Sequence, residues 1–254
     1  MINPLLKANL NLYSVLRNIE DMVMLDHDMT QMIKNWNESI FFWVFGGPQG
    51  GLIFENGQCR FYKTFSKAPG IKLAFISPTH FNQMMDGKGF PIPIKGFTKL
   101  NFLMNDFQTV SKKLEYYLKP SPERLLDNTY LMINTQLTLY TAAYAAEELC
   151  SIDPIAKKAA LQLNDGIVLM KILSDNQPAV HLTIENNQLR AAKGNIDHPT
   201  ASMIFKNTTI ANQFFNGLLD IFSSTATGDI QINGVIPMLD TLGLVLDRIP
   251  YYLT

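Results

Sequence analysis

The chain has 254 residues, of which 47% are hydrophobic and 17% charged, so it can build a sizeable core and is not a disordered chain. Its 21 lysines and arginines against 22 aspartates and glutamates leave a net charge of −1, which gives no overall electrostatic footprint for nucleic acid. No apolar run is long enough to span a bilayer, and the first residues lack the layout of a signal peptide. We therefore expect a cytoplasmic protein without stable membrane insertion.

The first half of the chain predicts helices around a set of short strands. Apolar runs rich in aromatic and β-branched residues indicate strands, and Asn56-Gly57 suits the positive φ of a tight hairpin turn. Ser77-Pro78 can begin a helix with a capping hydroxyl and a first-turn proline. In chain order we expect a helix at 10–36, strands at 40–45 and 50–54, a third strand after the hairpin turn and a fourth at 71–76. A helix ending at Gly87, a strand before Gly96 and a closing helix that reaches Tyr116 and Tyr117 follow.

The second half predicts the same order of elements. Asn186-Asn187 can make the hairpin turn because asparagine tolerates positive φ, and Asn207-Thr208 takes the place of the helix-starting Ser77-Pro78. In chain order we expect helical segments within 123–163 that are broken at Asp153-Pro154, strands at 167–172 and 179–184, a third strand after the hairpin turn and a fourth at 201–205. A helix with Gly217 at a C-cap position, a strand before Gly234 and a closing helix that reaches Tyr251 and Tyr252 follow.

The two halves also repeat in sequence. Residues 52–87 align without a gap on 182–217, and 12 of these 36 positions are identical, where chance gives about two. The offset of 130 falls to 127 upstream, which places Ile40 on Ile167, and rises to 138 downstream. The repeat predicts two tandem domains of one α+β fold, 1–120 and 121–254, each a mainly antiparallel five-stranded sheet with helices on one face. The proline-interrupted stretch 119–122 is a suitable boundary.

The second copy, from about 164 to 246, resembles the sterol carrier protein 2 family of lipid-transfer domains. The resemblance rests on the hairpin at 180–188, the strand at 201–205, the helix that follows, and the segment Thr227-Gly228-Asp229-Ile230-Gln231-Ile232-Asn233-Gly234. Family members typically carry basic residues in this last segment, whereas this chain has Asp229, Gln231 and Asn233. The first copy resembles the family only through the second. The resemblance implies an apolar tunnel between sheet and helices that holds a lipid-like molecule, and it implies no catalysis.

A ligand site is expected mainly in the second copy. There the helix after the fourth strand is expected to run over 209–222 with an apolar stripe, while its counterpart stops at Gly87 and so offers less of a roof. The expected tunnel lining is Leu169, Phe205, Phe214, Phe215, Leu218, Ile221 and Phe222. A plain core-facing helix explains the same stripe. The recurring Asn82-Gln83 and Asn212-Gln213 pairs fit either a ligand's polar end or bracing of the helix.

Motifs for catalysis are missing from the sequence. The glycine-rich loop 46–51 lies between two strands and lacks the lysine of a phosphate loop. Asp26-His27-Asp28 is better explained as an acidic helix start than as a metal site, and Cys59 and Cys150 stand at apolar positions of the repeat. We expect no catalytic residue, metal or cofactor.

The sequence therefore favours a non-catalytic protein, at most accessory to an enzyme, that binds or carries a fatty acid, a sterol-like molecule, an isoprenoid or a quinone. The alternative is a ligand-free interaction module built as an intramolecular pseudo-dimer, because a fold does not bring its function with it.

Overall fold

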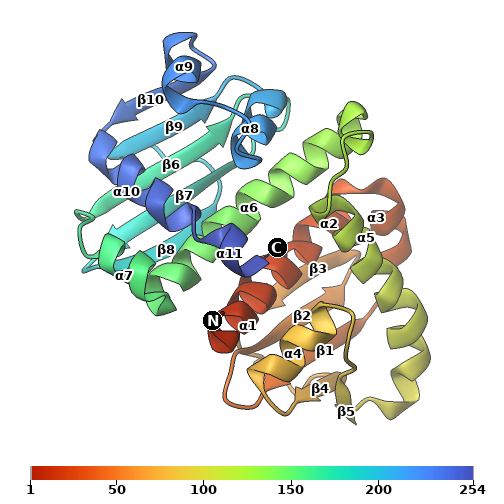
Figure 1. The fold of residues 1–254 in the computed structure, drawn as a ribbon. Helices are drawn as coiled ribbons and strands as arrows, with labels where there is room; N and C mark the ends of the chain where they lie inside the picture. Colours follow the sequence, from red (N-terminus) through yellow and green to blue (C-terminus); the bar gives the residue numbers. More distant parts are fainter. Residues whose placement is uncertain (1, 254) are drawn as a thin grey trace. The chain divides into compact units, whose positions relative to one another are not determined.

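The computed structural model describes residues 2–253 and divides the chain into two compact units, 1–119 and 120–254. We refer to them as unit 1 and unit 2 and describe each by itself (Figure 1). Each unit contains one five-stranded sheet.

Unit 1 begins with a helical segment that changes its winding along its length. It consists of α1 (Pro4–Leu10), a π-helical turn η1 (Asn11–Val15), a 3₁₀ turn η2 (Leu16–Asn18), α2 (Ile19–Leu25) and α3 (His27–Ile33). The expected single helix over 10–36 is therefore wrong in two respects. It starts earlier, where Asn3 accepts hydrogen bonds from the amides of Leu5 and Leu6, and it breaks at Asp26, whose side chain caps α3.

The sheet of unit 1 has the strand order β3-β2-β1-β4-β5, and only the β1–β4 pair is parallel. Its strands are β1 (Glu38–Val44), β2 (Gln49–Glu55), β3 (Gln58–Tyr62), β4 (Ile71–Phe75) and β5 (Ile92–Lys95). The remaining elements are α4 (Pro78–Met85), the short η3 (Phe97–Lys99), the π-helical η4 (Phe102–Phe107) and the closing helix α5 (Gln108–Leu118).

Unit 2 has the corresponding order β8-β7-β6-β9-β10, again with one parallel pair, β6–β9. Its first helices are η5 (Arg124–Leu126), α6 (Asn128–Ile152) and α7 (Pro154–Ala160), and its strands are β6 (Gly166–Ile172), β7 (Ala179–Glu185), β8 (Gln188–Lys193), β9 (Ala201–Phe205) and β10 (Ile230–Gly234). The later helices are α8 (Thr208–Phe215), α9 (Ile221–Ala226), α10 (Ile236–Leu246) and α11 (Ile249–Leu253). The expected α+β fold with two mostly antiparallel five-stranded sheets is confirmed.

Strand pairing corrects the repeat alignment at the first strand of each unit. Ile40 pairs with Leu52 and Val168 pairs with Leu182, so Ile40 corresponds to Val168 and not to Ile167. A shift of one residue exchanges the two faces of a strand. The corrected offset of 128 places Phe42 and Met170 at equivalent positions, and both are buried.

One face of each sheet is covered by helices. In unit 2, α6 packs on β7 and β8, α8 and α10 pack on β9, and α6 also contacts both α8 and α10, so the three helices share one face (Figure 1). Alternate residues of β6, namely Val168, Met170 and Ile172, are buried beneath them. The core of each unit therefore lies between its sheet and its helices, where an apolar ligand would have to be held.

Candidate functional site

Three phenylalanines meet between β9 and α8 in unit 2. Phe205, the last residue of β9, is fully buried, and its ring centroid lies 5.1 Å from that of Phe214 and 5.6 Å from that of Phe215. Phe214 and Phe215 are only partly buried, and their own centroids are 5.6 Å apart. These three residues of the expected tunnel lining form an apolar cluster that runs from the core toward the surface.

The helix expected over 209–222 is wrong, because it ends at Phe215. Gly217 has a φ of 68°, and the amide of Leu218 donates to the carbonyl of Gln213 at 2.9 Å, a pattern that closes a helix. Asp220 then caps a separate helix, α9, by accepting from the amide of Ser223 at 2.8 Å. The counterpart α4 is also eight residues long and ends in the same way at Gly87. The first copy therefore does not have a shorter helix at this position.

This break separates the other expected lining residues. Leu218 is 74% exposed in the α8–α9 link, Phe222 is 83% exposed on α9, and Ile221 is half-buried. Leu169 is buried but pairs with Ser202, whereas Ile172 pairs with Phe205, so Leu169 projects from the other face of the sheet. The structure thus brings Phe205, Phe214 and Phe215 together and places Leu169, Leu218 and Phe222 elsewhere.

The helix-covered face of unit 2 carries smaller side chains than that of unit 1. At equivalent positions, Phe42, Phe54, Phe61 and Phe81 of unit 1 are replaced by Met170, Ile184, Ala191 and Ala211. Phe81 and Ala211 occupy the same position of α4 and α8, and both are fully buried. Three of these replacements, at Phe54, Phe61 and Phe81, are visible in the gap-free repeat at positions that differ between the copies, whereas the replacement of Phe42 by Met170 required the strand pairing.

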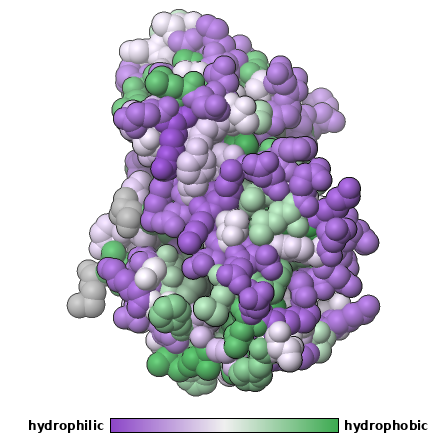
Figure 2. All heavy atoms as spheres, turned by 90° about the vertical axis from the view of Figure 1, so that its right-hand side faces the viewer, coloured by the Kyte–Doolittle hydropathy of each residue, from purple (hydrophilic) through white to green (hydrophobic). Residues whose placement is uncertain are grey.

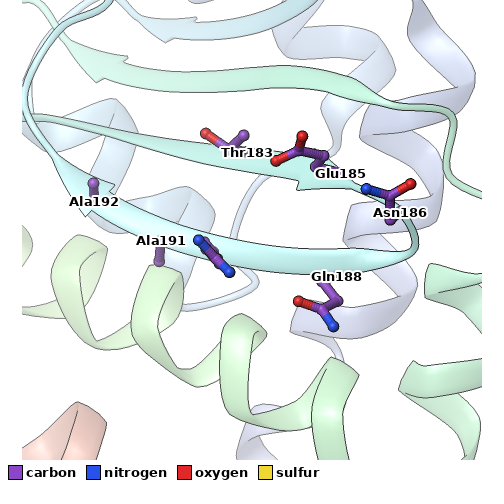
Figure 3. Close-up of a pocket in the computed structure, with 7 residues that line it drawn as sticks. Thr183, Glu185, Asn186, Gln188, Ala191 and Ala192 are labelled. Carbon is purple, nitrogen blue, oxygen red and sulfur yellow. The ribbon is translucent and has the colours of Figure 1, made fainter. Parts of the chain in front are cut away.

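Two open polar pockets lie on the hairpins β2–β3 and β7–β8, at equivalent positions of the two units. The larger, about 400 Å³, is lined by Thr183, Glu185, Asn186, Gln188, Arg190, Ala191 and Ala192 (Figure 3). The smaller, about 180 Å³, is lined by Ile53, Glu55, Asn56, Gln58 and Arg60.

A glutamate, an asparagine, a glutamine and an arginine line both pockets at equivalent positions of the two copies. In each pocket a glutamate and an arginine provide opposite charges on exposed side chains, and the two amides lie between them in sequence. In unit 1 the Arg60 guanidinium donates to Gln58 Oε1 at 3.3 Å. Neither pocket includes a residue of the expected tunnel lining, and their polar walls do not suit an apolar ligand.

A buried aspartate fastens the closing helix in each unit. In unit 1, Asp26 caps α3 and accepts from the Tyr117 hydroxyl at 2.7 Å, and the Lys113 ammonium lies 3.0 Å away. Burial opposes ionisation of Asp26, but the hydrogen bonds from Tyr117, Met29 and Lys113 outweigh it and lower the pKa of this carboxyl.

Unit 2 repeats this arrangement with other partners. Asp153 caps α7, accepts from the Tyr252 hydroxyl at 2.6 Å and pairs with Arg248 at 3.2 Å. Burial again opposes its ionisation, and the bonds from Tyr252, Ala156 and Arg248 outweigh it, so the pKa of Asp153 is lowered. We call these two groups the aspartate clasps. They explain the acidic helix start at Asp26, and within residues 2–253 no cluster of three or more potential metal ligands is found.

The recurring asparagines brace one helix against another. Asn82 of α4 donates to the carbonyl of Pro4 at 2.9 Å and accepts from the Asn11 amide at 3.0 Å. Asn212 of α8 donates to Asn134 Oδ1 at 2.7 Å and is 2.9 Å from the Thr135 hydroxyl. Both asparagines are buried, so the bracing interpretation accounts for their recurrence.

The two cysteines are buried as free thiols, as their apolar repeat positions led us to expect. Burial, with a smaller contribution from the charge of Asp153, raises the pKa of the Cys150 thiol to about 12. Because the thiolate is the reactive form, Cys150 is poorly suited to nucleophilic chemistry.

No family model matches the chain, and no curated protein matches it in sequence. Among solved structures it is similar to sterol carrier protein 2 from Yarrowia lipolytica in its apo form, at 14% identity and a TM-score of 0.33, over 41% of this chain and 92% of that one. The sterol carrier protein domain 2 of Helicoverpa armigera matches at 13% identity and a TM-score of 0.35, over 44% of this chain and 87% of that one.

A third match is the sterol carrier protein 2 of Aedes aegypti in complex with palmitate, at 16% identity and a TM-score of 0.29, over 47% of this chain and 94% of that one. The resemblance to sterol carrier protein 2 domains that the sequence suggested is thus found among solved structures. Each of these three matches spans less than half of the chain.

Proposed function

We propose that this protein binds an apolar small molecule, without chemistry on it, between the sheet and the helices of unit 2. The observation that carries the proposal is the replacement of Phe42, Phe54, Phe61 and Phe81 by smaller residues at the equivalent positions of unit 2. Once the helices move away from the sheet, smaller side chains on the covered face would leave more room for an acyl chain or a ring system than the phenylalanines of unit 1 do. Burying such a ligand would stabilise the complex by about 25 cal/mol per Å² of apolar surface.

The phenylalanine cluster provides the wall of this proposed site, and the α8–α9 link provides its entrance. Phe214 and Phe215 are partly exposed above the buried Phe205, and the link that follows them has Leu218 in solvent. In this proposal a ligand enters when α9 and the link move outward. Because α9 has only six residues, its displacement breaks few backbone hydrogen bonds.

We further propose that residues 1–120 and 121–254 are tandem domains that arose as copies of one fold. The shared strand order, the single parallel pair in each sheet and the repeated aspartate clasps support this interpretation. In this scheme the second domain carries the ligand, and the first has filled the corresponding space with phenylalanine rings. The candidate ligands are a fatty acid, a sterol-like molecule, an isoprenoid and a quinone.

The test uses the full chain and a substitution taken from unit 1. Ala211→Phe introduces the ring that Phe81 already supplies at this position, so it fills the proposed site. Because palmitate is the ligand of the Aedes aegypti protein, uptake of a fluorescent long-chain fatty acid is the first measurement. We expect Ala211→Phe to weaken uptake at least tenfold, and extraction of the unaltered protein into organic solvent to yield about one apolar molecule per chain by mass spectrometry.

The matched variant is Phe81→Ala in unit 1, which should leave uptake by unit 2 unchanged. Should Ala211→Phe fail to fold because of overpacking, Phe215→Ser serves instead, since this residue is only partly buried. Unaltered uptake in folded Ala211→Phe and Phe215→Ser variants would reject the proposed site. Absence of any extracted molecule together with absence of uptake would favour the ligand-free interaction module.

A further inference from the structure

The β5 edge of unit 1 exposes large apolar side chains within one short segment. Phe90 is 87% exposed, Ile92 44%, Ile94 43% and Phe97 62%, and we call these four residues the edge patch. Figure 2 shows hydrophobic residues gathered at the lower end of the molecule, where Figure 1 places β5. Exposed apolar side chains that cluster in this way mark interaction surfaces more often than isolated ones do.

Strand pairing extends the edge patch onto the outer face of the sheet. Ile92 pairs with Ala74, and Ala74 pairs with Trp43, so the three residues form one row across β5, β4 and β1. Trp43 is 38% exposed, and Lys72 Nζ lies 4.9 Å from its ring centroid. The row therefore joins an amphipathic tryptophan to the apolar side chains of the edge.

The charged side chains within residues 87–98, the segment of the edge patch, have a single sign. Lys88 and Lys95 are exposed within the same segment, and neither forms an ion pair within the residues that the structure describes. Residues 87–98 contain no aspartate or glutamate. Lys95 also pairs across strands with Lys72, which adds a third positive charge beside the row. The net charge of −1 for the whole chain conceals this local surplus.

The backbone of the segment also limits what can cover it. Pro91 and Pro93 lack amide hydrogens, so a further strand, whether from a second copy or from a peptide, cannot pair fully with this edge. The same loss of donors lowers the cost of moving the backbone into an apolar medium. His80 fixes the start of the segment, because its Nε2 lies 2.9 Å from the carbonyl oxygen of Phe90.

The geometry points to the edge patch as a docking site for an anionic phospholipid surface, in which Phe90 and Phe97 enter the interface and Lys88 and Lys95 meet lipid phosphates. Aromatic rings between lysines suit the boundary between headgroups and acyl chains. Docking would be peripheral, since no helix among the residues described is long and apolar enough to cross a membrane. The corresponding edge of unit 2 differs: Ile230 is fully buried, and Asp229 pairs with Lys206.

The test is sedimentation of the full, ligand-free chain with vesicles of phosphatidylcholine, with or without phosphatidylglycerol. We expect binding to the anionic vesicles, reduced about tenfold or more by Phe90→Ser combined with Phe97→Ser. Lys95→Glu should weaken binding about fivefold or more on anionic vesicles only, and salt should suppress the remaining electrostatic part. The matched control is Leu126→Ser, which removes an apolar side chain that is 85% exposed outside the patch.

A second measurement locates the residue in the membrane. In a chain in which Trp36 and Trp43 are replaced by phenylalanine, a tryptophan introduced by Phe97→Trp should be quenched by brominated acyl chains, whereas one introduced by Leu126→Trp should not. Equal vesicle binding by the unaltered chain, the double serine variant and Leu126→Ser would overturn the proposal. So would a self-associating chain that ignores vesicles and becomes monomeric in the double variant. None of these assays contains a fatty acid ligand, so their outcome is independent of the proposed ligand site.

Discussion

Unit 1 and unit 2 build the same sheet topology from side chains of different size and polarity. Unit 1 fills its covered face with phenylalanines and leaves an apolar, lysine-flanked edge, whereas unit 2 has smaller residues in the core and an acidic, polar edge. Features that both units keep are the aspartate clasps, the helix-bracing asparagines and the glycines that end α4 and α8. Contacts between elements are therefore shared by the two units, while the residues that fill the core or are exposed at the edge have diverged.

The largest loss of stability is expected from truncating a core phenylalanine of unit 1. Phe81→Ala should lower the free energy of unfolding of unit 1 by about 3 to 5 kcal/mol, because it removes a fully buried ring and leaves a cavity. Phe215→Ala in unit 2 removes a partly exposed ring and should cost clearly less. Urea unfolding of both variants, with hydrogen exchange to assign the loss to one unit, measures the difference. Equal losses would mean that the two cores are filled alike.

The next largest loss of stability is expected from the aspartate clasps. Asp153→Asn should lower the free energy of unfolding by about 2 to 3 kcal/mol, because Arg248 and Tyr252 lose a charged acceptor. Asp26→Asn should have a similar effect in unit 1, where Lys113 and Tyr117 lose theirs. Thermal unfolding of each variant at neutral pH gives the two values. A loss confined to one variant would show that the two aspartate clasps, although similar in geometry, do not contribute equally to the free energy of unfolding.

The clasps also set the sign of the acid response. Since the pKa values of Asp26 and Asp153 lie below the ordinary value of 3.8, their contribution is complete above that pH and is lost as the pH falls through the native pKa. Unfolding free energies measured across the acid range should therefore fall less steeply in Asp153→Asn than in the unaltered chain. Parallel curves would contradict a clasp that acts through ionised Asp153.

A smaller effect is expected from the bracing asparagines. Asn212→Ala should cost about 1 to 2 kcal/mol, since Asn134 and Thr135 on α6 are left buried with fewer partners. Asn82→Ala should cost a similar amount through Asn11 and the carbonyl of Pro4. Denaturant midpoints provide the measurement. If fatty acid uptake changed while stability did not, the amides would instead belong to the ligand site.

The smallest effect concerns the helix ends. Gly217→Ala and Gly87→Ala should each lower the free energy of unfolding by about 1 kcal/mol, because both glycines have positive φ, which disfavours alanine. The loss should be no larger, since an added methyl group would meet no neighbouring atom at either position. Gly243→Ala, within α10 and equally free of neighbours, should stabilise by a few tenths to about 1 kcal/mol through helix propensity. Opposite signs in thermal unfolding separate the two cases. A shared sign would mean that α8 does not end at Phe215.

Much of the fold and less of the site could be predicted from the sequence. The apolar runs, the Asn56 turn, the cap at Ser77 and the stop at Gly87 are local signals, and each element they predicted is present in both units. Predicting the site required knowing which residues lie close together in the folded chain. Leu169, Leu218 and Phe222 were placed in one lining because they are apolar and near in sequence, and this is a weak guide to shared space.

The order of elements and the shared glycines and caps could be predicted from the residues alone, because they depend on backbone conformation and on hydrogen bonds within a few residues. The face of the sheet on which Leu169 lies depends on tertiary pairing. Alternation along β6 separates two sets of side chains, but the pairing with β9 shows which set shares a face with Phe205. Gly217 signals the end of α8 locally, as Gly87 does for α4, but the apolar stripe that continues to Phe222 in sequence suggested a longer helix than the backbone forms. Long-range pairing, such as that between Asp153 and Arg248, joins residues whose separation no local pattern encodes.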